Sequence, residues 1–319
     1  MENRIFGNAR QMKWMVSQML RIRTALTGLL FIFSLGFMVT APLHGDETAN
    51  TAVKQPELLG AGAAKKFPGS KIDWRGYSCY KFEYDGKPCM VITPKTIAPG
   101  KPWIFRAEFF DYKPEVDLAL LAKGYHLAFI NVDGMFGCPK AVSHWNAFYQ
   151  YLTEKYGFAK KAVLEGQSRG ALMAYNWGIA NPDKVACVYV EAGVSDFKSW
   201  PAGNGTGCGN APEWANLLKE YGLTEDEALA YKGNPIDNLE PLAKAKVPLI
   251  SVHGKTDEIV PAEENALLVE QRYKKLGGEI TVIMQSSETP FHKGNVRGHI
   301  VGLEDNTPVV EFILKHADK

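Results

Sequence analysis

The chain has 319 residues, with 36 Lys and Arg against 35 Asp and Glu, so its formal net charge is +1. A balance this even argues against nucleic acid or another polyanion as a partner. The length beyond the N-terminal region suits one domain of α/β size with a full hydrophobic core.

The N-terminal region has the pattern of an export signal. Two arginines precede an acid-free apolar run over residues 24–41, and the polar segment HGDETAN follows. This pattern predicts a signal peptide over residues 1–45 and a secreted or periplasmic protein. The run is close to the lower length limit of a membrane span, so an uncleaved membrane anchor is the alternative. Residues 46–72 are expected to be a linker and N-terminal segment.

From residue 73 to 319, apolar runs alternate with amphipathic helical patterns, which predicts an α/β domain with a mostly parallel sheet covered on both faces. Residues 193–242, rich in Gly, Trp and Pro, are expected to form a lid-like insertion over the carboxyl edge of the sheet. The expected elements are, in chain order, a hairpin of Cys79–Tyr84 and Cys89–Thr93, a strand Trp103–Ala107, a helix Val116–Lys123, a strand His126–Val132, a helix Ser143–Lys155, a strand before Ser168, a helix to Ala180, a strand Ala186–Glu191, a strand Pro248–Val252, a helix Ala262–Leu276, a strand Glu279–Met284 and a helix Pro308–His316.

The sequence Gly-Gln-Ser-Arg-Gly joins one of these strands to the next helix and contains a candidate nucleophile. A strand, tight turn and helix would hold the hydroxyl of Ser168 exposed on a strained corner. Gly166 and Gly170 lack the Cβ atoms that would collide where the strand reverses into the helix. The backbone N–H of Arg169 would point at an anion forming above Ser168. This segment resembles the nucleophile turn of the α/β-hydrolase superfamily and implies its fold.

The loop HGKTDEIVP contains the candidate acid. It resembles the acid loop of the same superfamily, HGxxDxxVP, and Asp257 is the matching residue. The competing explanation is a solvated aspartate that caps the following helix. Glu258, Glu191 and Asp196 are the other candidate acids, and His253 is expected to be structural, satisfied by loop backbone.

Two histidines near the C-terminus are candidates for the base. His299 follows a glycine and precedes the terminal helix, as the superfamily's catalytic histidine does, so it is expected to take the proton of Ser168. His292 is the alternative base and otherwise a polar residue near the substrate. Because no two histidines have zinc-ligand spacing, we expect no metal site, and no other cofactor is implied.

The second oxyanion donor is expected in the loop Arg-Ala-Glu-Phe-Phe-Asp, which departs from the lipase-type HGGG pattern. By position, the backbone N–H of Glu108 would act beside that of Arg169, with Ala107 as the alternative. An ion pair between Arg106 and Glu108 is the competing explanation for these two side chains.

Glycine-rich loops with aromatic residues are the candidate substrate-binding segments. Gly134 and Met135 follow a strand end, and Trp200 lies in the insertion, where aromatic rings beside glycines suit either sugar stacking or a lid core.

Export would also permit disulfides among the five cysteines. Cys138 and Cys208 could pair if their loops meet, whereas Cys79 and Cys89 face opposite sides of the hairpin, and Cys187 is expected to be a buried thiol.

The resemblance covers nearly everything after Asp73 and is greatest to exported bacterial esterases and prolyl-oligopeptidase-like catalytic domains. It implies a secreted serine esterase that cleaves carboxylic esters through an acyl-enzyme, with acylated poly- or oligosaccharides as the expected substrate by analogy. A peptidase of the prolyl-oligopeptidase-like type is one alternative, although the chain has no room for a propeller domain. The other is a non-catalytic hydrolase-like protein that binds a glycan or a protein, which would require a broken triad.

Overall fold

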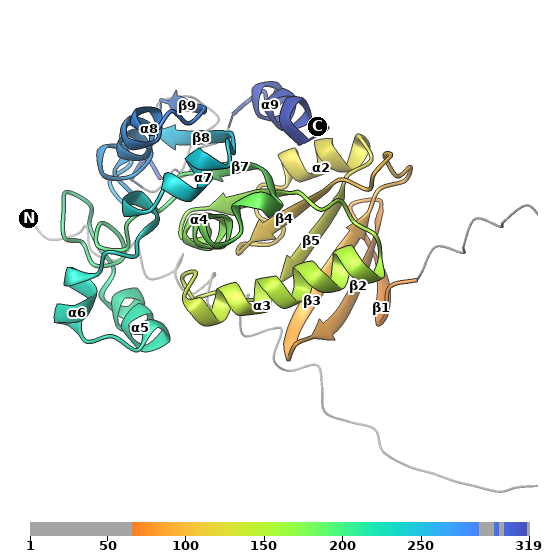
Figure 1. Ribbon diagram of the computed structural model, residues 1–319, viewed down its shortest axis with the longest axis horizontal. Coiled ribbons are helices and arrows are strands. Elements are labelled where there is room, and N and C mark those ends of the chain that lie inside the picture. The colour runs from red at the N-terminus through yellow and green to blue at the C-terminus, as the bar shows by residue number, and fades with distance from the viewer. Residues whose placement is uncertain (1–65, 287–296, 300–302, 318–319) are drawn as a thin grey trace, which may run out of the picture. The chain divides into compact units, whose positions relative to one another are not determined.

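The computed structural model describes residues 66–286, 297–299 and 303–317 (Figure 1). The predicted signal peptide, most of the predicted linker and His292 lie outside these residues. Within the described residues, none of the helices combines the length and apolar character that a membrane span requires.

The strands and helices of the described residues alternate as expected. The strands are β1 (Ser70–Trp74), β2 (Tyr77–Tyr84), β3 (Lys87–Thr93), β4 (Trp103–Ala107), β5 (His126–Ile130), β6 (Ala162–Gln167), β7 (Val185–Glu191), β8 (Leu249–Gly254) and β9 (Ile280–Gln285). The helices are α2 (Glu115–Ala122), α3 (Pro139–Gln150) continued by a π turn (Tyr151–Lys155), α4 (Gly170–Ala180), α5 (Ala211–Tyr221), α6 (Glu225–Ala230), α7 (Glu240–Lys244), α8 (Ala266–Lys275) and α9 (Thr307–Ala317), with single 3₁₀ turns at Pro182–Lys184, Pro235–Asp237 and Ala262–Glu264.

One sheet of nine strands has the order β1-β2-β3-β5-β4-β6-β7-β8-β9. Neighbours from β1 to β5 in this order pair antiparallel, and all pairs from β5 to β9 are parallel. The mostly parallel sheet that opens with an antiparallel hairpin is therefore confirmed. Because the parallel strands share one direction, the loops that follow β4, β6 and β8 meet at the same edge of the sheet.

Helices cover both faces of the sheet, as Figure 1 shows for α2 and α9 on one side and α3 and α4 on the other. The side chains of β4 alternate accordingly. Phe105 belongs to the buried cluster that contains Trp145 of α3 and Trp177 of α4, and Ile104 belongs to the cluster that contains Leu120 of α2. Since each strand residue turns to the face opposite its neighbour, the fully apolar run of β4 is explained by burial on both sides.

β1 is the strand that the sequence pattern does not reveal. It begins at Ser70, before the predicted domain boundary at residue 73, and pairs antiparallel with β2. Four of its five residues are exposed, so it carries no apolar run that would predict a strand.

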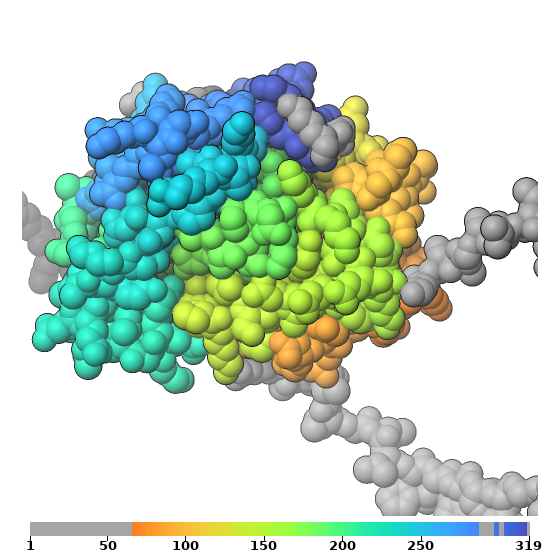
Figure 2. All heavy atoms as spheres, viewed as in Figure 1, coloured from red at the N-terminus to blue at the C-terminus, as the bar shows by residue number. Residues whose placement is uncertain are grey.

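The insertion over residues 193–242 folds into α5, α6, a 3₁₀ turn and α7. Asn210 caps α5 by accepting a hydrogen bond from the backbone N–H of Glu213, and Thr224 forms a capping box with Glu227 at the start of α6. The insertion contributes Phe197, Trp200 and Leu217 to an apolar cluster that also contains Phe136, Leu172 of α4 and Val260 of the acid loop. In Figure 2 the teal surface of the insertion continues that of α3 and α8.

All five cysteines are free thiols. Cys138 and Cys208, which could have paired if their loops met, do not form a disulfide. Cys138 is buried in the core, whereas Cys208 is exposed and its backbone N–H donates to the carbonyl of Glu258. Cys79 and Cys89 lie in the core clusters on opposite faces of the sheet, as expected from the hairpin register.

Candidate active site

Ser168 lies at the turn between β6 and α4 with a φ of +49°, in the left-handed region that non-glycine residues rarely adopt. Its N–H donates to the carbonyl of Glu191, and its carbonyl accepts from the N–H of Val194, so the loop after β7 holds the turn on both sides. A strained conformation of this kind persists only where its surroundings fix it.

Two glycines permit the close packing of this turn. A Cβ at Gly166 would lie 2.7 Å from the Cα of Ala171, and one at Gly170 would lie 2.6 Å from the carbonyl oxygen of Ala107. Both contacts are with backbone, which cannot move aside as a flexible side chain would. The Gly-x-Ser-x-Gly spacing is therefore a steric requirement of this fold.

The structure brings Ser168, His299 and Asp257 together. Ser168 Oγ lies 2.9 Å from His299 Nε2, and His299 Nδ1 lies 2.8 Å from Asp257 Oδ2. Since an ionised carboxylate only accepts hydrogen bonds, Nδ1 carries the proton and Nε2 is left to accept from the serine hydroxyl. This arrangement can withdraw the proton of Ser168 as its oxygen attacks a carbonyl carbon.

The Asp257 carboxylate is fully buried and held in one orientation. Its Oδ1 accepts hydrogen bonds from the N–H groups of Ile259 and Val260 at 3.0 and 2.9 Å, which leaves Oδ2 for His299. Glu258, Glu191 and Asp196, the other acids considered, form no hydrogen bond with His299 among the described residues.

The imidazole of His253 contacts the acid loop at Val260 and Asp257. Its Nε2 donates to the carbonyl of Val260 at 2.7 Å and lies 3.5 Å from Asp257 Oδ2. Burial lowers the pKa of His253, so its ring is neutral beside the carboxylate. The backbone partner is the structural role expected for this histidine.

The segment that carries His299 is joined to the acid loop through backbone. The N–H of Glu258 donates to the carbonyl of Arg297 at 2.8 Å. Gly298 has a φ of +71°, and a Cβ on it would lie 2.2 Å from the carbonyl oxygen of Thr256. The imidazole is thus positioned by two loops that pack against each other.

The loop after β4 packs against the start of α4. Glu108 and Phe109 have φ values of +55° and +43°, although neither is a glycine. Glycine adopts this conformation without strain, whereas these two residues must be held in it by their surroundings. Beside them, the carbonyl of Ala107 and the Cβ of Glu108 lie against Gly170. The backbone N–H groups of Glu108 and Arg169 therefore belong to adjacent turns next to Ser168.

The side chains of these two residues form an ion pair. Arg169 Nε donates to Glu108 Oε2 at 2.5 Å, and Arg169 Nη1 donates to Glu213 Oε1 of the insertion at 2.8 Å. Burial raises the pKa of Glu108 to about 7, an effect that the charge of Arg169 partly offsets. The predicted pairing of Arg106 with Glu108 is wrong, because Arg106 is buried between the carboxylates of Asp117 and Glu165.

Of the predicted substrate-binding residues, Gly134 lies beside the candidate active site, whereas the side chains of Met135 and Trp200 are buried. Gly134 lies next to the loop after β4, where its N–H donates to Glu108 Oε1 at 3.3 Å. Met135 and Trp200 are only 6% and 8% exposed, and Trp200 packs beside Phe136 within the insertion cluster. Because its ring is buried, Trp200 belongs to a lid core, the second of the two roles expected for it, and offers no face for stacking on a sugar. Of His292 the structure gives no description.

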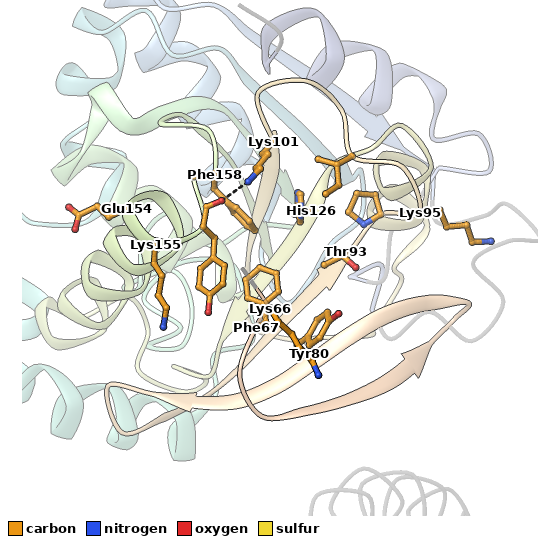
Figure 3. Close-up of a pocket in the computed structure, with 14 residues that line it drawn as sticks. Lys66, Phe67, Tyr80, Thr93, Lys95, Lys101, His126, Glu154, Lys155 and Phe158 are labelled. Atoms are coloured by element: carbon orange, nitrogen blue, oxygen red, sulfur yellow. Dashed lines mark hydrogen bonds between the residues drawn. The ribbon is translucent and has the colours of Figure 1, made fainter. Parts of the chain in front are cut away.

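A cavity of about 640 Å³ lies at the other end of the strands. Figure 3 shows Phe67, Tyr80 and His126 around it, and Lys101 donates to the carbonyl of Tyr156 at its rim. His126 is the first residue of β5 and Lys101 precedes β4, so this cavity faces the amino edge, opposite Ser168. It is not part of the candidate active site.

Glu213 is a site residue that the sequence gives no means of predicting. It lies in the first turn of α5, where an acid is common for its favourable interaction with the helix dipole. Its contact with Arg169 depends on how the insertion folds back. Within the described residues, no cluster of His, Cys, Asp and Glu suits a metal ion.

Comparisons with known proteins agree with this geometry. The model of the family described as "Prolyl oligopeptidase family" matches residues 142–318, a range that includes Ser168, Asp257 and His299. No curated protein matches the chain.

Solved structures of similar fold include three peptidases. The acylaminoacyl peptidase of Pyrococcus horikoshii is 16% identical over 78% of this chain and 44% of its own, with a TM-score of 0.55. A puromycin-hydrolyzing peptidase of Mycobacterium tuberculosis is 14% identical over 74% of this chain and 38% of its own, with a TM-score of 0.56. Dipeptidyl peptidase 4 of Porphyromonas gingivalis is 12% identical over 75% of this chain and 35% of its own, with a TM-score of 0.54. The chain thus spans less than half the length of these proteins, and the expected α/β-hydrolase fold is confirmed.

Proposed function

Since the chain belongs to the prolyl oligopeptidase family of serine hydrolases, we propose that it is a serine peptidase that cleaves peptide bonds through an acyl-enzyme. The observation that carries this proposal is the hydrogen-bonded chain from Ser168 through His299 to Asp257. The peptidase activities named for the proteins of similar fold support an amide as the bond that is cleaved.

In the proposed mechanism, Ser168 Oγ attacks the carbonyl carbon of the substrate while His299 Nε2 takes the hydroxyl proton. The N–H groups of Arg169 and Glu108 stabilise the oxyanion of the tetrahedral intermediate. The intermediate collapses, the leaving amine takes the proton from His299, and the acyl group stays on Ser168. A water molecule then gives its proton to His299, attacks the acyl-enzyme and releases the carboxylic acid.

Ester hydrolysis at the same serine is the second candidate activity. An acyl-enzyme forms equally from an ester, whose alkoxide is a better leaving group than an amine. Deacylation of a glycan has weaker support than peptide cleavage, because it rests on analogy alone and the buried ring of Trp200 offers no surface for stacking on a sugar. A purely binding role would require a broken triad, whereas all three members are in contact.

Hydrolysis of a peptidyl p-nitroanilide and of a p-nitrophenyl ester by the wild type and by Ser168→Ala tests this proposal. We expect Ser168→Ala to lose at least about 10³-fold in kcat on both substrates. Ser143→Ala, which changes an exposed serine of α3, is the matched control and should keep full activity. Equal rates for Ser168→Ala and the wild type would contradict the mechanism. Turnover of the ester without the anilide would favour the esterase.

We also propose that the chain is exported, on the pattern of residues 1–45. N-terminal sequencing of the protein from the medium or the periplasm tests this, with a start between residues 42 and 46 as the expected result. Recovery of the intact N-terminus in the membrane fraction would support an uncleaved anchor instead.

A further inference from the structure

The ion pair of Arg169 with Glu108 joins the two residues whose backbone N–H groups are the proposed oxyanion donors. The Glu108 side chain is 1% exposed and that of Arg169 is 15% exposed, so water competes little for this pair. Because each residue offers both a backbone donor and a charged side chain, a side-chain contact between them also fixes the distance between their turns.

Both side chains are held from several directions. Glu108 Oε1 accepts the N–H of Gly134, which ties the loop after β4 to the loop after β5. The guanidinium of Arg169 lies over the rings of Phe109 and Phe136, at 5.3 and 5.7 Å from their centroids. Its Nη1 donates to Glu213 of α5. A planar guanidinium suits such a site, because it can stack on rings and donate in two directions at once.

The backbone of the loop needs support of this kind. Glu108 and Phe109 are two successive non-glycine residues with positive φ, a conformation that relaxes unless contacts hold it. If the turn relaxed, the N–H of Glu108 would rotate away from the position of the oxyanion, to which the N–H of Arg169 is also proposed to donate.

We propose that Arg169 and Glu108 are positioning residues whose ion pair keeps the oxyanion hole formed, and that Glu213 attaches the insertion to it. This proposal rests on the function proposed above. Neither side chain touches the reacting atoms. Each acts through the backbone N–H groups.

A double-mutant cycle on a peptidyl p-nitroanilide tests the pair, with Arg169→Met, Glu108→Gln and the combined variant, at a pH well above the pKa of about 7 of Glu108, where its carboxyl is ionised. We expect each single variant to lower kcat about 10- to 10³-fold, with KM within about threefold, because the oxyanion exists only after the attack. The combined variant should be no slower than the worse single one, since both remove the same contact. Arg169→Lys should recover only part of kcat, because an ammonium lacks the fork of donors.

Inhibition by a peptidyl boronic acid gives a second readout. Its tetrahedral adduct with a serine presents a boron-bound oxygen where the oxyanion forms, so its affinity should fall by the same factor as kcat/KM in each variant. Glu213→Gln should lower kcat less than Arg169→Met, because the bond to Glu108 remains. Arg272→Met removes an ion pair with Asp237 outside the site and should leave kcat unchanged.

Additive losses in the cycle, or losses confined to KM, would overturn the proposal. If Arg169→Met does not fold by circular dichroism, the comparison is made with Arg169→Lys and Glu108→Gln. An inactive Ser168→Ala together with a fully active Arg169→Met would refute the positioning role alone. An active Ser168→Ala would refute the proposed function itself.

Discussion

Asp257 is the buried end of the hydrogen-bond chain, and the contacts of its two oxygens determine what an amide would do there. In Asp257→Asn the amide oxygen would accept from Ile259 and Val260, as Oδ1 does now, and the NH₂ group would face His299 Nδ1. The imidazole would then carry its proton on Nε2 and could not accept from Ser168. We predict a loss of about 10⁴-fold in kcat.

Steady-state kinetics on the p-nitroanilide checks this prediction, with Glu258→Gln as the control for the neighbouring acid. The control should stay within about threefold of the wild type. A large loss in Glu258→Gln with little loss in Asp257→Asn would assign the acid to residue 258.

Glu108 predicts a pH dependence of stability. Burial raises its pKa from 4.5 to about 7, so the folded protein holds this proton more tightly than the unfolded chain does. The stabilisation is complete below about pH 4.5 and is lost as the pH rises through about 7. As the pH rises from about 5 to about 7.5, the Tm of the wild type should therefore fall relative to that of Glu108→Gln.

Thermal unfolding followed by circular dichroism at several pH values measures this difference. Glu264→Gln is the control. Burial raises the pKa of Glu264, but hydrogen bonds from Ser199 and Thr206 outweigh this effect and lower the pKa below its usual value, so this carboxyl is already ionised in the range measured. The Tm difference between Glu264→Gln and the wild type should stay constant over the same range. A constant difference for Glu108→Gln as well would show that Glu108 does not titrate there.

The candidate residues differ in how far the sequence predicts them. Ser168 and Asp257 stand in contiguous motifs whose spacing reflects local backbone geometry, so each could be proposed from its own segment. The partners of Arg169 are 61 and 44 positions away, so its ion pairs depend on tertiary packing that no single segment of the sequence reveals. The burial of Trp200 is likewise a property of how the insertion closes on Phe136.

Helix α4 begins at the nucleophile turn, and its two glycines predict different outcomes. In Gly170→Ala the new Cβ would meet the carbonyl oxygen of Ala107 at 2.6 Å, so the helix or the loop after β4 must shift. In Gly178→Ala the nearest atom is the side-chain Cδ1 of Leu164 at 3.1 Å, and alanine favours the helix by about 1 kcal/mol. We predict that Gly170→Ala loses both kcat and Tm, whereas Gly178→Ala stays close to the wild type in both.

Kinetics and Tm of these two variants together check the steric explanation. A fully active Gly170→Ala would show that the contact with Ala107 does not position the turn.

Strands and helices with an apolar pattern could be predicted, and those without one could not. β4 was expected over the residues where it occurs, since burial on both faces produces an unbroken apolar run. β1 has no such run because it is an exposed edge strand. The helix expected from Ser143 begins at Pro139, where proline's fixed φ suits the first turn but the residues carry no helical periodicity.

The candidate active site is assembled from segments far apart in the chain. The turn at Ser168, the loop of Asp257 and the segment of His299 all follow parallel strands or lie at their carboxyl edge, as the doubly covered sheet requires. The fold class was therefore predictable from the alternation of elements, and it brings the Ser, Asp and His motifs to one edge. An insertion over that edge was expected too, but its contact with Arg169 through Glu213 was not, because that contact comes from tertiary packing.

The proposed mechanism requires that the folded chain makes Ser168 a nucleophile. Treatment with a fluorophosphonate, followed by mass spectrometry of the intact protein and its peptides, tests this most directly. We expect one adduct per chain, on Ser168. It should disappear in Ser168→Ala and after unfolding, because the hydroxyl is activated only through His299 and Asp257. An unmodified protein, an adduct on another residue, or equal labelling of the unfolded chain would contradict it.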